Sequence, residues 1–166
     1  INGHLHSVNQ VDVIDVGSGN SYPVKEFIDK LNKLGKIHKY IALDISEELL
    51  NLSRKNFKKW FPKIEFASDT IDIENSCLPK NLLRSQGQDE ADDIAKIILH
   101  LGVTIGNHQN RIGVLSNFRD SMGKNDLLVF TNETGSNSKW DGRVRGGFKY
   151  HAEQVYAWLK NKIGIR

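Results

Sequence analysis

The chain has 166 residues, of which 39% are hydrophobic and 26% are charged. This balance is typical of one folded domain with its own core, and it excludes a disordered chain and two domains of ordinary size. The net charge of +3 is too small to indicate a nucleic-acid-binding protein by itself. No apolar stretch approaches the roughly 18 residues that a membrane-spanning helix needs, so we expect no membrane partner.

The chain begins at Ile1, and no signal-peptide pattern follows. We therefore expect residues 1–166 to form a single domain that is a fragment of a longer, cytoplasmic protein. Cys77 is the only cysteine, and the pair His4 and His6 has no third ligand in view. These residues predict neither a disulfide framework nor a metal site.

Short apolar segments alternate along the chain with segments of helical periodicity. We expect strands at residues 11–16, 39–43, 64–67, 94–101 and 126–131. We expect helices at residues 23–34, 47–61, 107–122 and 150–163, with one further helical turn near residues 79–84. The rest of residues 70–93 is expected to be a long loop, and residues 132–147 form a polar, glycine-rich stretch.

Local signals define the ends of these helices. Ser46 and Asn107 are expected to cap the helices that follow them, and Gly35 and Gly123 are expected to stop helices. The apolar spacing predicts a set of inward-facing side chains. In chain order they are Val24, Phe27, Ile28, Leu31, Leu34, Leu49, Leu50, Ser53, Phe57, Trp60, Ile112, Leu115 and Phe118.

Repeated strand–helix units of this length predict an α/β fold, in which a parallel sheet is covered by helices on both faces. In such sheets, ligands bind beyond the carboxyl ends of the strands, near the point where the strand order reverses. Four segments are expected to share that rim: residues 17–20, Asp44, residues 69–73 and residues 102–107.

A glycine turn, Asp15-Val16-Gly17-Ser18-Gly19, follows the first expected strand and precedes the first helix. A dinucleotide fingerprint would have a third glycine where Tyr22 stands, which counts against an NAD site. Asp15 suits a cationic ligand group such as an amino-acid ammonium. Asp44 is placed to accept both hydroxyls of a ribose, and Asp72 is placed to accept from an adenine amino group. The alternative is an ordinary turn with solvated acids at the strand ends.

This pattern of three acids resembles the Rossmann-like methyltransferases that use S-adenosylmethionine. Leu101-Gly102-Val103-Thr104-Ile105-Gly106-Asn107 further resembles the L-G-[ST]-T-I-G-N signature of the histidine-specific methyltransferase family, which includes the histidine Nα-methylating enzyme of ergothioneine biosynthesis. Residues 15–19 (DVGSG), 43–46 (LDIS) and 61–65 (FPKIE) agree with other family motifs in order and spacing. The resemblance covers most of residues 12–126 and implies S-adenosylmethionine as the cofactor.

The resemblance also implies roles for individual residues. Gly17, Asp44, Asp72 and Ile73 would contact the cofactor, and Asn107 would hold the substrate amino acid. Trp140 lies near a family tyrosine that binds substrate, and it can stack on an imidazole although it has no hydroxyl. The complete set of predicted cofactor-binding residues is Asp15, Gly17, Ser18, Gly19, Asp44, Ile45, Asp72, Ile73 and Gly102. The predicted substrate-binding residues are Thr104, Asn107 and Trp140.

The expected chemistry is in-line methyl transfer to the amine of an amino acid, histidine or a related small molecule. Asn107 is expected to orient this acceptor, and Glu133 is the candidate general base. His108 and His151 are expected to be surface histidines. Two alternatives remain. One is an RNA or protein methyltransferase that uses the basic stretch 139–150. The other is a non-catalytic module with the same fold. The D/N-P-P-Y/F element typical of base-methylating enzymes is absent from residues 102–107, so a nucleic-acid partner is disfavoured.

Overall fold

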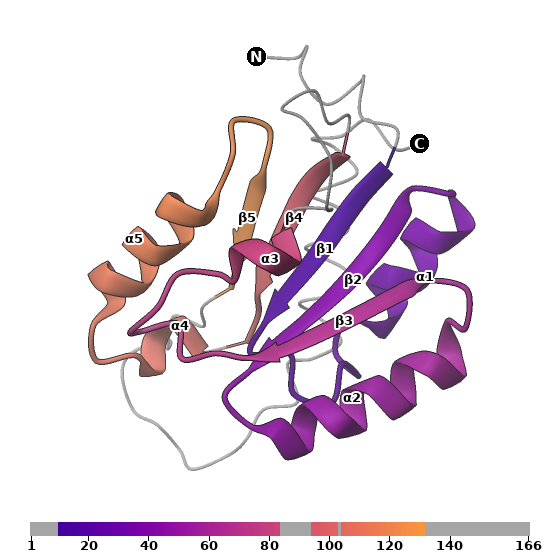
Figure 1. Ribbon diagram of the computed structural model, residues 1–166, viewed down its shortest axis with the longest axis horizontal. Coiled ribbons are helices and arrows are strands. Elements are labelled where there is room, and N and C mark those ends of the chain that lie inside the picture. Colours follow the sequence, from indigo (N-terminus) through magenta and orange to yellow (C-terminus); the bar gives the residue numbers. More distant parts are fainter. Residues whose placement is uncertain (1–9, 84–93, 103, 132–166) are drawn as a thin grey trace, which may run out of the picture.

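A five-stranded parallel sheet forms the centre of the computed structural model, which describes residues 10–83, 94–102 and 104–131 (Figure 1). The sheet order is β3-β2-β1-β4-β5, and every neighbouring pair is parallel. The strands are β1 (Gln10–Val16), β2 (Ile37–Asp44), β3 (Glu65–Thr70), β4 (Ile94–His100) and β5 (Leu127–Phe130). The order reverses between β1 and β4, which places the ligand-binding crevice of such a sheet beyond the ends of these two strands.

Helices follow the strands in the expected alternation. They are α1 (Lys25–Lys33), α2 (Glu47–Trp60), α3 (Lys80–Leu83), α4 (Thr104–Asn107) and α5 (Arg111–Ser121). The side chain of Ser46 accepts a hydrogen bond from the backbone N–H of Leu49, which confirms Ser46 as the N-cap of α2. Gly35 has a φ of 64° just after α1, so it ends that helix as expected.

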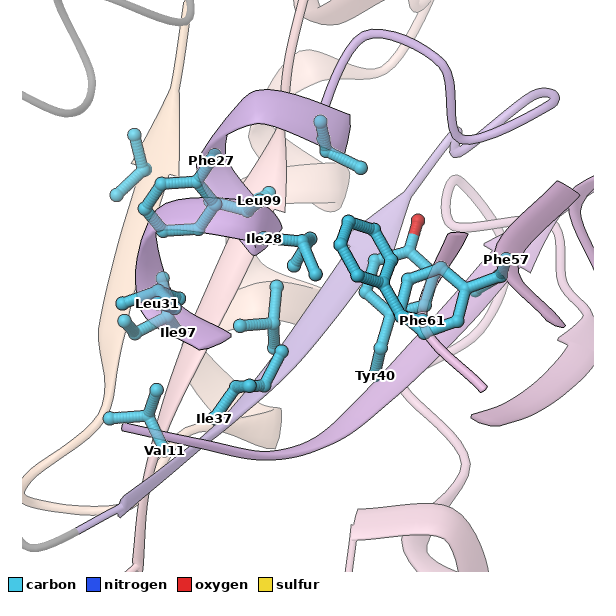
Figure 2. Close-up of a cluster of buried hydrophobic side chains, with 14 of the residues drawn as sticks. Val11, Phe27, Ile28, Leu31, Ile37, Tyr40, Phe57, Phe61, Ile97 and Leu99 are labelled. Atoms are coloured by element: carbon cyan, nitrogen blue, oxygen red, sulfur yellow. The ribbon is translucent and has the colours of Figure 1, made fainter. Parts of the chain in front are cut away.

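Two apolar clusters show that helices cover both faces of the sheet. Successive side chains of a strand point to opposite faces, so Val13 and Ile14 of β1 lie in different clusters. The first cluster packs α1 and α2 against the sheet, with Phe27, Ile28 and Leu31 from α1 (Figure 2). The second cluster packs Val114 and Phe118 of α5 against the other face. The expected α/β fold with helices on both faces is therefore confirmed.

Aromatic packing is concentrated in the first cluster. The rings of Tyr40 and Phe57 stack with centroids 4.4 Å apart and an interplanar angle of 9°. Figure 2 shows Tyr40, Phe57 and Phe61 gathered beside the aliphatic residues of α1. This stacking holds the C-terminal part of α2 against β2, whose carboxyl end carries Asp44.

The region after β4 differs from the expected single helix. Asn107 is the last residue of the short helix α4, and Asn110 caps α5 instead by accepting from the backbone N–H of Gly113 at 2.9 Å. Because α5 begins at Arg111, its buried face holds Val114 and Phe118, whereas Ile112 is 80% exposed and Leu115 is exposed. The prediction that Asn107 is an N-cap and that Ile112 and Leu115 face inward is wrong.

Smaller differences concern helix ends. Leu34 follows the last turn of α1 and Leu49 lies in the first turn of α2, and both are exposed rather than buried. Helix α3 confirms the helical turn expected near residues 79–84. The expected helix at 150–163 lies outside the described residues, as does the basic stretch 139–150. No helix in the described ranges is long and apolar enough to cross a membrane.

Candidate cofactor and acceptor site

The glycine turn after β1 lies against the end of β2. Gly17 and Gly19 have φ angles of 78° and 53°, a conformation in which a side chain would be strained. The backbone N–H groups of Gly17 and Ser18 donate to the carbonyl of Leu43 at 2.8 and 3.1 Å. A Cβ added at Gly19 would meet no atom within 4 Å, so the space beside this residue is open. The turn therefore has the shape that lets a ligand approach the backbone closely.

Asp44 organises the end of β2. One carboxylate oxygen accepts from the backbone N–H of Gly19 at 2.8 Å, and the other accepts from the N–H of Ser46 at 3.0 Å. The residue is buried, and each carboxylate oxygen has a second lone pair that these bonds leave available. Asp44 can therefore fix the glycine turn and still accept two ligand hydroxyls.

Asp15 is buried beneath the glycine turn. Its carboxyl accepts from the Tyr40 hydroxyl at 2.7 Å, and Tyr40 in turn accepts from Ser21 Oγ at 2.7 Å. Burial raises the pKa of Asp15 to about 7, against the lowering effect of the Tyr40 hydrogen bond and with a further rise from the charge of Asp44. Burial also raises the pKa of Tyr40, so the phenol stays a donor. The sequence did not indicate Tyr40 as the partner of Asp15.

Ser18 carries an unsatisfied polar atom at the same turn. Its Oγ is buried and has no hydrogen-bond partner within the described part of the chain. Buried hydroxyls are almost always paired, so an orphaned one at a turn of this shape is an atom that a ligand can satisfy. This observation fits a ligand seated on the glycine turn.

The turn after β3 carries the predicted acidic–apolar pair. Asp72 is exposed, and its side chain accepts from the Glu74 backbone N–H at 3.0 Å and from Asn75 Nδ2 at 2.6 Å. Ile73 is buried in the second cluster. Ile45, which directly follows Asp44, is 71% exposed. The rim thus combines acceptors and apolar surface, as recognition of a nucleoside requires.

The segment after β4 brings the signature residues to the same rim. Gly102 has a φ of 85°, and its N–H donates to Thr131 Oγ1 at 2.7 Å, which ties this turn to the end of β5. Thr104 begins α4 and Asn107 ends it with an exposed side chain. Two further predicted site residues, Glu133 and Trp140, lie outside the described residues.

The structure adds three residues that the sequence did not predict to be part of the site. His100 is buried at the end of β4, and its Nδ1 lies 2.9 Å from the carbonyl oxygen of Val16. Its Nε2 lies 3.1 Å from Nε2 of His108, whose Nδ1 lies 2.7 Å from Glu74 Oε1. The expectation that His108 is a surface histidine is wrong, because both ring nitrogens have partners inside the protein. The position of His100 in the most apolar strand was the available signal.

These contacts affect the charges of the three groups. Burial lowers the pKa of His100, and the neighbouring charge of His108 lowers it further. The hydrogen bond from His108 lowers the pKa of Glu74. His100 is therefore neutral and Glu74 is a carboxylate near neutral pH. Across the described ranges, no group of three or more His, Cys, Asp or Glu is arranged to hold a metal ion.

Solved structures with this fold include a putative methyltransferase from Bacillus halodurans, with a TM-score of 0.52 and 13% identity over 92% of this chain and 53% of that one. The chain superposes on the CMeT domain of the citrinin polyketide synthase with a TM-score of 0.56 and 21% identity, covering 73% of this chain and 28% of that one. It superposes on LepI, solved in complex with S-adenosylmethionine, with a TM-score of 0.54 and 12% identity over 93% of this chain and 33% of that one. These similarities confirm the Rossmann-like methyltransferase fold.

Sequence comparison is more specific. The chain is 30% identical over 122 residues to ergothioneine biosynthesis protein 1 of Neurospora crassa. That match spans 70% of this chain but only 13% of the Neurospora protein. Residues 3–140 match the family described as histidine-specific methyltransferase, SAM-dependent. The chain therefore belongs to the histidine-specific, S-adenosylmethionine-dependent methyltransferase family.

Proposed function

We propose that this chain binds S-adenosylmethionine at the rim of β1, β2 and β4 and transfers its methyl group to the amine of a small acceptor, with histidine as the first candidate. The observation that carries the proposal is the double role of Asp44, which anchors the glycine turn and keeps two acceptor positions for ribose hydroxyls. Family membership and the similarity to ergothioneine biosynthesis protein 1 support both the cofactor and an amino-acid acceptor.

The residues around Asp44 fit the rest of the cofactor. The open space at Gly19 and the orphaned Ser18 Oγ suit a ligand lying on the glycine turn with Gly17 beneath it. Asp15 would accept the ammonium of the methionine part, in its ionised form. The ligand would then run from β1 toward β2.

The turns after β2 and β3 would bind the adenine end of the cofactor. Asp72 would accept from the adenine amino group, and Ile73 and Ile45 would lie against the ring. Gly102 would contact the cofactor from the side of β4. The combination of acids for the polar groups and aliphatic side chains for the base is the recognition chemistry that a nucleoside needs.

The protein's part in the reaction is to position the acceptor. The bound cofactor supplies a methyl group made reactive by a sulfonium. Asn107 would orient the amine, with Thr104 and Trp140 completing the acceptor site, so that the nitrogen lies about 3–3.5 Å from the methyl carbon. The amine must lose its proton before attack, and Glu133 is the candidate that would accept it.

Calorimetric titration with S-adenosylhomocysteine, followed by mass spectrometry of histidine incubated with the chain and S-adenosylmethionine, tests the proposal. We expect saturable binding of S-adenosylhomocysteine, no heat with NAD, and a methylated histidine. Binding without methylated histidine would retain the cofactor and reject histidine as the acceptor of this chain. Binding of NAD in place of S-adenosylhomocysteine, or of neither, would overturn the proposal.

A further inference from the structure

Three side chains form a continuous hydrogen-bonded chain across the rim. Glu74 lies in the turn after β3, His108 lies between α4 and α5, and His100 ends β4. The contacts run from Glu74 Oε1 to His108 Nδ1 at 2.7 Å, from His108 Nε2 to His100 Nε2 at 3.1 Å, and from His100 Nδ1 to the carbonyl of Val16 at 2.9 Å. This series of hydrogen bonds ends at Val16, the last residue of β1, beside the point where the strand order reverses.

Counting donors and acceptors indicates where the protons lie in this series of hydrogen bonds. The Val16 carbonyl only accepts, so His100 Nδ1 carries a hydrogen, and the neutral ring then accepts at Nε2. His108 must donate to it from Nε2. The Glu74 carboxylate also accepts, so His108 donates from Nδ1 as well. His108 therefore donates toward Glu74 on one side and toward His100 on the other, and its hydrogen bond to the Glu74 carboxylate is charge-assisted.

This series of hydrogen bonds joins the two halves of the proposed site. Glu74 directly follows Ile73 in the turn assigned to adenine, and His108 directly follows Asn107, the residue assigned to the acceptor. Glu74 also accepts from the backbone N–H groups of Gln109 and Asn110 at 3.3 and 3.4 Å. The cofactor turn and the acceptor turn are therefore linked through the Glu74 carboxylate and the His108 ring.

We propose that Glu74 and His108 are positioning residues that form a latch between the cofactor turn (residues 71–76) and the acceptor turn (residues 104–110), so that cofactor binding on one side orders Asn107 on the other. The inference rests on the proposed function for the identity of the ligands, whereas the latch itself is a property of the protein alone. Both nitrogens of His108 are occupied within the protein, so His108 acts through Asn107 and not on the acceptor directly.

Hydrogen exchange followed by mass spectrometry tests the latch without a ligand. We expect His108→Leu to raise exchange roughly tenfold in residues 71–76, on the far side of the contact, because a charge-assisted hydrogen bond is lost. His108→Asn should restore most of the protection, since its amide N–H can still donate to Glu74. Glu74→Gln, which removes the charge and keeps the shape, should give an intermediate result.

A matched control is present at the opposite end of the sheet. His38 Nδ1 lies 2.8 Å from Asp12 Oδ1, a histidine–carboxylate contact of nearly the same length. His38→Leu should leave exchange in both turns unchanged. If His108→Leu and Glu74→Gln both fold and leave residues 71–76 as protected as in the native chain, the latch is wrong.

Hydrogen exchange with added ligand tests whether cofactor binding orders the acceptor turn. Adding S-adenosylhomocysteine should lower exchange in residues 104–110 of the native chain and of His108→Asn, but not of His108→Leu. The affinity of His108→Leu for S-adenosylhomocysteine should be roughly five- to tenfold weaker. Equal ordering of the acceptor turn in His108→Leu would overturn the coupling. If the native chain does not bind S-adenosylhomocysteine, the proposed function and the coupling both fail, while the exchange of the ligand-free variants still decides the latch.

Discussion

The backbone N–H of Gly19 donates to Oδ2 of Asp44 across 2.8 Å, and this bond joins the glycine turn after β1 to the end of β2. The second oxygen of the same carboxylate accepts from Ser46, where α2 is about to begin. One side chain thus holds the glycine turn, the end of a strand and the start of a helix. A residue placed in this way shapes a site even before it touches a ligand.

Replacing Asp44 should weaken cofactor binding strongly. We expect Asp44→Ala to reduce the affinity for S-adenosylhomocysteine by roughly tenfold to a hundredfold, because charge-assisted hydrogen bonds to the ribose are lost and Gly19 loses its partner. Calorimetry measures the effect. Asp120→Ala is the matched control, since Asp120 is an exposed acid in α5 whose Oδ1 accepts from the adjacent Arg119 side chain. Equal affinities of the two variants would refute the ribose assignment.

The stability of the fold should depend on the ionisation of Asp15. The pKa of this carboxyl is about 7 in the folded protein and near the ordinary value of 3.8 in the unfolded chain, so the folded state binds more protons between these two pH values. Stability from this group is therefore present at low pH and falls as the pH rises toward 7. As the pH rises from 5.5 to 8.5, we expect the free energy of unfolding of the native chain to fall by about 2 kcal/mol more than that of Asp15→Asn.

Urea unfolding of both proteins at the two pH values measures this difference. Asp69→Asn serves as the control for the general effect of removing one acid. Parallel pH dependence of the native chain and Asp15→Asn would show that Asp15 ionises normally inside the fold. The prediction would then be wrong whatever the absolute stabilities.

The face of α5 that packs on the sheet can be tested with two substitutions. Phe118 is fully buried, so Phe118→Ala should lower the free energy of unfolding by roughly 3–5 kcal/mol through lost burial and a cavity. Ile112 is 80% exposed, so Ile112→Ala should change it by less than about 0.5 kcal/mol. Chemical denaturation monitored by circular dichroism compares them. A cost at Ile112 similar to that at Phe118 would favour the inward face that the sequence suggested.

Two glycines after helices should respond differently to alanine. Gly35 has a φ of 64° and open space around its Cβ position, so Gly35→Ala should cost roughly 1–2 kcal/mol from backbone conformation alone. Gly123 has no positive φ, and a Cβ there would make an ordinary contact with Asp126 at 3.5 Å. Gly123→Ala should therefore be close to neutral. Thermal unfolding of the two variants measures these costs. An equal loss of stability in Gly35→Ala and Gly123→Ala would contradict the conformational role of Gly35.

The sheet could be predicted because buried parallel strands read as short apolar runs, as in residues 11–16 and 94–101. The rim could be predicted because the acids and glycines of the site follow those runs directly. Asp44 and the glycine turn needed only the order of strand, turn and helix. Their location at the end of β2 and after β1 is confirmed, whereas their contacts with the cofactor remain predictions.

The contacts that the sequence did not indicate join residues far apart in the chain. Tyr40 reaches Asp15 because β1 and β2 are neighbours with Asp15 opposite Ala42, a register that local patterns do not define. A histidine in the most apolar strand was a signal for His100, but its contact with Val16 follows only from the pairing of β4 with β1. The helix after β4 was misplaced because two asparagines, Asn107 and Asn110, both suit an N-cap, and the short helix α4 ends at the first of them.

The hydrogen bond between His100 and the Val16 carbonyl spans 84 positions in the chain. The unit β1–α1–β2, with the glycine turn and Asp44, can assemble from nearby residues, but the β4 side of the crevice must wait until a long loop has closed. We therefore expect the cofactor site to be among the last parts of the protein to form during folding. Cofactor binding would then indicate that the fold is complete, because the unit β1–α1–β2 alone lacks the side of the site that β4 supplies.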